Sequence, residues 1–210
     1  MIIWSVMRMS KCLVLFVEGE TEVEFYKQVI ANARKKRKNG ILDINIECKN
    51  VPGVGGFKNI ALRKFTKEIK PKYGDDCQFV VALCRDTDVF EISPKPPVKW
   101  DEVERDMYDA GASNVIHICA KHSIEDWFLC DIEGIKAFLR LSKKTKVSGK
   151  NGYEKLKNLY KSVNKMYYKG MRSNGMISKL DIDKIVDSVK DQLYPLYIVL
   201  GVELPKKKTK

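Results

Sequence analysis

The sequence predicts an α/β protein in which a mainly parallel, four-stranded sheet lies between helices, followed by a basic helical extension. Four short apolar runs alternate with longer segments of helical spacing, as in repeated βαβ units. Most of these runs are apolar on both faces, which is typical of parallel strands buried between two helical layers. Beyond residue 131 the strand-like runs stop and only helical spacing continues.

The strands are expected where Val, Ile, Leu and Phe concentrate, at 12–17, 44–49, 79–84 and 115–119. Helices are expected between them, where apolar residues recur every three or four positions, at 21–38, 57–70 and 100–110. Further helices are expected at 124–138, 153–163 and 181–193, the last ending before Pro195. Thr21 and Glu24 have the spacing of a capping box, and Ser123 that of an N-cap.

The length of 210 residues predicts one compact domain with an appendage. We expect a core over residues 1–131 and a basic helical extension over 132–210 that packs on it, with a flexible tail at 204–210. No apolar stretch approaches the roughly 20 residues that span a bilayer, so we expect no membrane association. The six cysteines form no CxxC pair, which favours reduced thiols in the cytoplasm.

The charge of the chain is unevenly distributed. Residues 1–131 contain 20 basic and 20 acidic side chains, whereas residues 132–210 contain 19 basic and 7 acidic ones and carry the whole net charge of +12. Such a one-signed flank favours a polyanionic partner such as DNA or RNA, although a solvated surface is the alternative. The candidate nucleic-acid-binding residues are Lys58, which follows a glycine-rich turn, and Lys143, Lys144, Lys146, Lys165 and Arg172.

Acidic residues follow three of the predicted strands. Glu18 occupies the turn after the first strand, and Glu22 falls in the first turn of the next helix. Asp86 and Asp88 end the third strand, where two carboxylates spaced by one residue can point to the same side. Since the carboxyl ends of parallel strands meet at one edge of the sheet, these acids are candidate ligands of a shared divalent cation.

The fourth predicted strand also ends in polar residues, because Ser123 and Glu125 lie where it gives way to a helix. This arrangement places a third carboxylate position at the same edge of the sheet. The alternative is that Glu125 only complements the positive end of the helix dipole.

The order of these motifs, Glu-Gly-x-Thr-Glu, then Asp-x-Asp, then Ser-x-Glu, resembles the TOPRIM domain over residues 11–131. It is most similar to the version in OLD-family nucleases and in small stand-alone TOPRIM proteins of prokaryotic phage-defence loci. The resemblance implies a Rossmann-like TOPRIM fold and hydrolysis of DNA or RNA with Mg²⁺ or Mn²⁺. It also implies a possible ATPase partner protein.

The resemblance assigns roles to individual residues. Glu18, Asp86 and Asp88 would be the central metal acids, and Glu22, Ser123 and Glu125 would complete a second metal position. A lysine further along the chain would assist at the scissile phosphate; Lys169 is the first candidate, followed by Lys165 and Lys179. Two such cations could activate a water and stabilise the leaving oxygen.

Two other classes of protein remain as alternatives. The first is a non-catalytic subunit that holds nucleic acid for a partner by means of its basic flank. The second is a phosphoacceptor receiver domain, which is also a doubly wound sheet with clustered acids. The glutamates and the Asp-x-Asp pattern fit a receiver poorly, because it places an acidic pair after its first strand and the acceptor aspartate after its third.

Overall fold

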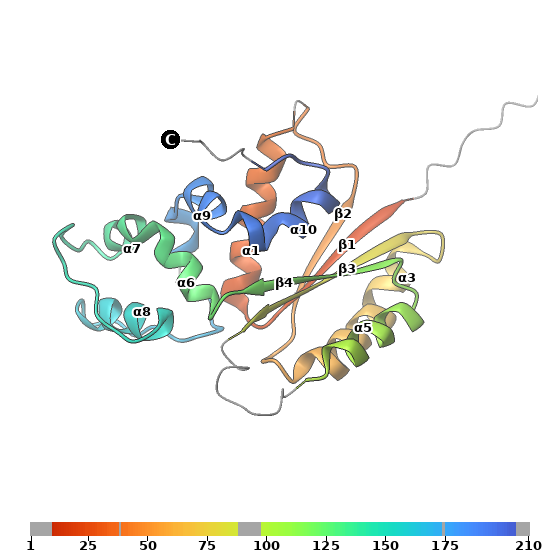
Figure 1. Cartoon of the computed structure of the whole chain (residues 1–210), viewed down its shortest axis with the longest axis horizontal. Helices are drawn as coiled ribbons and strands as arrows, with labels where there is room; N and C mark the ends of the chain where they lie inside the picture. The colour runs from red at the N-terminus through yellow and green to blue at the C-terminus, as the bar shows by residue number, and fades with distance from the viewer. Residues whose placement is uncertain (1–9, 38, 88–97, 174, 205–210) are drawn as a thin grey trace, which may run out of the picture.

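The structure is a computed structural model that describes residues 10–37, 39–87, 98–173 and 175–204 (Figure 1). Its centre is a four-stranded sheet in the order β2-β1-β3-β4, and every strand pairing in the described ranges is parallel. The strands are β1 (Lys11–Val17), β2 (Asn45–Asn50), β3 (Gln78–Asp86) and β4 (Asn114–Ala120). The predicted α/β class is therefore confirmed.

Helices cover both faces of the sheet (Figure 1). On one face lie α1 and the C-terminal helices, and on the other lie α5 and a helical segment over residues 57–73. The first group comprises α1 (Glu20–Lys35), α6 (Ile124–Phe128), α7 (Ile132–Phe138), α8 (Gly152–Lys161), α9 (Ile182–Ser188) and α10 (Lys190–Leu200). The second comprises α5 (Trp100–Asp109) and π turns at Phe57–Ala61 and Phe65–Ile69 that alternate with α2 (Leu62–Lys64) and α3 (Lys70–Tyr73).

The strand β1 lies at the centre of the sheet because both of its faces are apolar. Leu13, Leu15 and Val17 point into the core beneath α1. The alternate residues of β1, such as Val14 and Phe16, point into the core beneath α5. Successive side chains of β1 thus alternate between the two faces of the sheet and are apolar on both. This is the pattern that predicted a strand with helices on both sides.

The C-terminal helices share one hydrophobic core with the sheet, which runs from Leu13 on β1 to Val202 after α10. Trp127 of α6 is among the largest fully buried side chains, and its indole Nε1 donates to Gln192 of α10 at 3.1 Å. The extension thus packs on the sheet. Of the expected flexible tail at 204–210, all but Leu204 lies outside the described residues.

The predicted helices at 124–138 and 181–193 both differ from the structure, and the second is divided at Val189 into α9 and α10. The chain does not end its last helix before Pro195, because α10 continues through this proline to Leu200. An internal proline costs about 3 kcal/mol, but α10 buries Leu193, Leu196, Tyr197 and Leu200, each worth about 1.5 to 3 kcal/mol. The expected helix at 124–138 is interrupted at Leu129–Asp131, where Asp131 leaves the helical conformation to bind the backbone N–H of Asp181 at 2.8 Å.

The order of the strands creates a switch point between β1 and β3. From β1 the chain passes through α1 to β2 on one side, and it then crosses to β3 on the other side. Ligands of open α/β sheets bind at the carboxyl ends of strands at such a point. In the described part of the chain, no helix is long and apolar enough to cross a membrane.

Candidate active site

Glu18 lies immediately after β1, at the switch point. Its backbone N–H donates to Oε2 of Glu22 at 2.9 Å, and its own Oε1 accepts from the backbone N–H of Asp86 at 3.2 Å. Glu22 is buried in the first turn of α1. The structure therefore brings together the carboxylates that follow β1 and β3, which are neighbours in the sheet.

Asp86 is the last residue of β3, and only 2% of it is exposed. Its Oδ1 accepts from the backbone N–H of Ile124 at 2.8 Å, and its Oδ2 lies 2.8 Å from the ammonium Nζ of Lys169. The next residue, Thr87, donates its hydroxyl to Ala120 at the end of β4 at 3.1 Å. These contacts fix Asp86 between the ends of β1 and β4.

Glu125 reaches the same region from the first turn of α6, and only 1% of it is exposed. Its Oε1 accepts from the hydroxyl of Tyr167 at 3.0 Å, whereas its buried Oε2 has no hydrogen-bond partner among the described residues. Ser123 occupies the N-cap position as predicted, but its hydroxyl donates to Asp126 at 2.9 Å instead of capping the helix.

Glu18, Glu22, Asp86 and Glu125 form the group that we call the acidic cluster. Burial raises the pKa of Glu22 well above its usual value, and the negative charges of Asp86 and Glu18 raise it further. Burial also raises the pKa of Asp86 from 3.8 to about 7; the Lys169 ammonium opposes this increase, while Glu125 and Glu18 add to it. The cluster therefore holds crowded carboxylates that compete for protons or cations.

The segment over residues 166–173 delivers Tyr167 and Lys169 to the acidic cluster from beyond α8. It docks on the N-terminal end of α1, where Gly170 O accepts from the backbone N–H of Glu20 at 2.8 Å. The two chains approach so closely that a Cβ on Gly19 would collide with the backbone of Gly170, which itself has a φ of +76°. Glycine at both positions is what permits this contact.

The docking of this segment explains why the predicted capping box is wrong. Gly19 is the N-cap of α1 and has no capping side chain. The Thr21 hydroxyl instead donates to the carbonyl of Met171, and Glu24 accepts from the hydroxyl and the backbone N–H of Ser173. Both side chains hold the 166–173 segment, a role that local spacing could not reveal.

The other predicted site residues lie in varied places. Asp88 lies outside the described residues. Lys165 lies over the ring of Phe138 at 5.9 Å, Lys179 ends a short helical turn, and Arg172 is an exposed residue of the docked segment. Lys58 forms an ion pair with Glu102 of α5 at 3.6 Å, on the other face of the sheet. The exposed loop between α7 and α8 holds Lys143, Lys144 and Lys146.

Lys169 pairs with Asp86, whereas the described contacts of Lys165 and Lys179 include no partner in the acidic cluster. Sequence reasoning missed Tyr167, although it lies in the same short run, "MYYKG", as Lys169. A buried tyrosine whose hydroxyl faces a carboxylate leaves no local pattern in the sequence.

The acidic cluster has some of the features of a metal site. As the side chains stand in the described ranges, no three His, Cys, Asp or Glu side chains are close enough together to hold one ion. Two features nevertheless fit a divalent cation. The buried Oε2 of Glu125 has no hydrogen-bond partner among the described residues, and burial together with mutual repulsion raises the pKa of Glu22 and of Asp86. Carboxylate oxygens are the ligands that Mg²⁺ and Mn²⁺ prefer.

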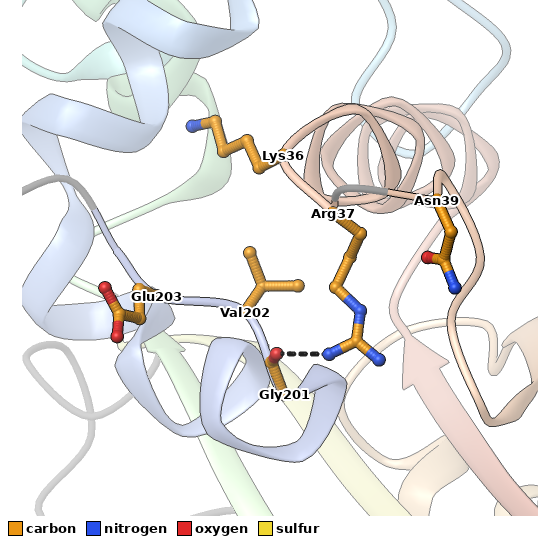
Figure 2. Close-up of a pocket in the computed structure, with 6 residues that line it drawn as sticks. All are labelled: Lys36, Arg37, Asn39, Gly201, Val202 and Glu203. Carbon is orange, nitrogen blue, oxygen red and sulfur yellow. Dashed lines mark hydrogen bonds between the residues drawn. The ribbon is translucent and has the colours of Figure 1, made fainter.

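A pocket of about 470 Å³ lies at the other end of α1 (Figure 2). Arg37 crosses it and donates to the carbonyl of Gly201 at 2.8 Å, which ties the end of α1 to the end of α10. Lys36, at the edge of this pocket, follows Glu22 by fourteen residues, or about 21 Å of helix. The pocket is therefore separate from the acidic cluster.

Comparison with known proteins gave one result. Neither the curated proteins nor the solved structures contain a match to this chain. The sequence model of a family described as a domain of unknown function, DUF4276, matches residues 17–189. This region begins at the last residue of β1 and includes the acidic cluster and Lys169. Because the match covers more than four-fifths of the chain, the protein belongs to the DUF4276 family.

Proposed function

We propose that this protein is a divalent-metal-dependent nuclease that hydrolyses phosphodiester bonds of DNA or RNA. The observation that carries the proposal is the acidic cluster: carboxylates that follow β1, β3 and β4 meet at the switch point of the sheet beside Lys169. Such a cluster is costly in the absence of a cation and is the kind of donor set that binds Mg²⁺ or Mn²⁺.

In this proposal Glu18, Glu22, Asp86 and Glu125 hold the metal, together with Asp88 as a further candidate. A bound divalent cation would supply a nucleophilic water at neutral pH and stabilise developing negative charge. The Tyr167 hydroxyl orients Glu125 by donating to its Oε1, so that Oε2 is left to face a ligand. The Lys169 ammonium is held at the cluster and can bind a phosphate oxygen of the substrate.

The TOPRIM resemblance supports the same function and extends it. Glu18, Glu22, Asp86 and Glu125, which it assigns to metal binding, are the residues of the acidic cluster. A role in defence against phages or mobile elements and an ATPase partner protein rest on the resemblance alone. A cytoplasmic location is compatible with a defence role and with an ATPase partner.

A second candidate function is a non-catalytic subunit that binds nucleic acid within a larger ATPase-containing complex. The observation that favours it is the ion pair between Lys169 and Asp86, in which a protein cation already neutralises a central carboxylate. The basic extension would supply binding in either case.

Cleavage assays distinguish the two functions. Purified protein is incubated with supercoiled plasmid, single-stranded DNA and RNA in Mg²⁺, Mn²⁺ or EDTA. The nuclease proposal expects cleavage with either metal, none in EDTA, and loss of activity in Asp86→Asn and Glu18→Gln. The matched control is Asp131→Asn, since Asp131 is a buried aspartate whose partners, Asp181 and Lys184, lie outside the cluster. Equal cleavage by wild type and both cluster variants would refute the metal assignment.

A further inference from the structure

The 166–173 segment combines side chains that contact the acidic cluster with large apolar side chains that are exposed. Tyr167 is buried and binds Glu125, and Lys169 pairs with Asp86, whereas Met166, Tyr168 and Met171 are 70%, 50% and 59% exposed. Seven large apolar side chains are exposed in the described part of the chain, and three of them lie within residues 166–171. Single exposed apolar side chains are common on protein surfaces, whereas three within six residues are not, and such a group can mark a binding surface.

Met166 and Tyr168 form one exposed patch, and Met171 is held close to it in the chain because its backbone N–H donates to the Tyr168 carbonyl at 3.4 Å. The Tyr168 hydroxyl lies 3.0 Å from the sulfur of Met166, so the two side chains are in contact. Tyr168 and Lys169 are consecutive residues, with Cα atoms about 3.8 Å apart. A molecule that covers Tyr168 therefore lies close to the backbone of Lys169, the lysine that pairs with Asp86.

The charge around this patch identifies the kind of molecule that fits it. Between Lys155 and Lys179 the sequence has seven basic and no acidic side chains, and three of these cations, Lys165, Lys169 and Arg172, lie within or next to the segment. An exposed aromatic ring among cations is the combination that binds single-stranded nucleic acid, because phosphates pair with the cations while bases stack on the ring. A protein partner of ordinary composition would gain nothing from this one-signed charge.

We propose that Tyr168, flanked by Met166 and Met171, is a stacking platform for unpaired bases, and that the substrate class is single-stranded nucleic acid. This inference rests on the proposed nuclease function and specifies its substrate. Bases in a duplex are already stacked on one another and cannot lie on the ring. The flexible methionine side chains can adapt to whichever base lies against them, which predicts little sequence preference.

The test is a binding assay in EDTA, which prevents metal-dependent cleavage. Fluorescein-labelled 20-nucleotide single strands of DNA and RNA, and the matching 20-base-pair DNA duplex, are titrated with protein at several salt concentrations. Tyr168→Ala should weaken single-strand binding about five- to hundredfold. Tyr168→Phe, which keeps the ring, should bind within twofold of wild type. The control is Tyr194→Ala, which removes a tyrosine of similar exposure (56%) from α10.

Two further readouts separate stacking from charge. The duplex affinity of Tyr168→Ala should match that of wild type, and its salt dependence should be unchanged because no cation is lost. The proposal is wrong if Tyr168→Ala binds single strands as wild type does, which would leave the patch for a protein partner. It is also wrong if Tyr168→Phe loses as much affinity as Tyr168→Ala, or if the duplex is weakened equally.

Failure of this inference can be told apart from failure of the nuclease function. The same oligonucleotides are incubated with Mn²⁺ and either wild type or Asp86→Asn. A protein that binds single strands through Tyr168 without cleaving them supports the platform and refutes the nuclease. A protein that cleaves them in an Asp86-dependent way, with Tyr168→Ala binding normally, refutes the platform and leaves the nuclease standing.

Discussion

Replacement of Asp86 by Asn should stabilise the metal-free protein, and the gain should be clearly larger at pH 8 than at pH 5. In the folded protein the pKa of Asp86 is about 7, against 3.8 for an ordinary aspartate. A raised acid pKa means that the folded state holds a proton that the unfolded state has released. Stability therefore falls as the pH rises from about 4 to about 7.

The size of the effect follows from the same two values. Their separation of about three pH units corresponds to about 4 kcal/mol, since each unit is worth about 1.4 kcal/mol. The groups that face Asp86 are Glu18, Glu22 and Glu125, which add to the effect, and Lys169, which opposes it. Asn keeps an acceptor for the backbone of Ile124 but leaves the Lys169 ammonium without its partner, so we expect a net gain of about 1 to 3 kcal/mol.

The assay is thermal unfolding in EDTA at pH 5 and pH 8, followed by circular dichroism. A gain of this size raises the melting temperature by about 2 to 4 °C for each kcal/mol in a chain of this length. Asp131→Asn is the control, because the pKa of Asp131 is lowered and its contribution changes only at lower pH. With saturating Mn²⁺ the wild type should gain stability that Asp86→Asn does not. Wild-type stability that increases from pH 5 to pH 8 in EDTA would refute the reasoning.

Four other perturbations test neighbouring parts of the site. Tyr167→Phe leaves the buried Glu125 without its hydrogen bond and should cost about 1 to 3 kcal/mol of stability and weaken Mn²⁺ binding, measured by urea unfolding and calorimetry. Gly19→Ala should displace Gly170 and slow cleavage at saturating substrate, with the circular dichroism spectrum unchanged. Lys169→Gln should slow turnover with little loss of affinity for substrate; equal loss of both would contradict its placement at the cluster. The last variant replaces Lys143, Lys144 and Lys146 of the exposed loop by Gln. It should lower the affinity for duplex DNA and reduce the slope of log affinity against log salt concentration by up to about 3, with turnover intact.

The arrangement of the sheet was predictable because its strands carry a local pattern. A run such as Leu13–Val17 is apolar at every position, so only a doubly covered strand suits it. Parallel strands then end at one edge, and that geometry alone brings the residues after β1, β3 and β4 together. The proximity of Glu18, Asp86 and Glu125 follows from topology and not from any contact that the sequence displays.

The contacts of the 166–173 segment were not predictable in the same way. Thr21 and Glu24 match a capping box, and nothing near them in the sequence shows that Met171 and Ser173 will bind them instead. These pairs are about 150 residues apart, and the extension is so rich in lysine that one lysine cannot be singled out by composition. The close approach of Gly19 and Gly170 is likewise visible only in three dimensions.

The contact between Lys169 and Asp86 links the two candidate functions. In the structure Lys169 lies against a carboxylate whose ionisation is opposed by burial and by three neighbouring acids. If the protein is a nuclease as proposed, a divalent cation held by Asp86 would take the place of this ammonium, and Lys169 could then bind a phosphate oxygen of the substrate. In a binding subunit the pair stays closed and neutralises the cluster permanently. In either proposed function the basic extension and the exposed Tyr168 would bind the nucleic acid, so the two proposals differ in whether the ion pair between Lys169 and Asp86 opens.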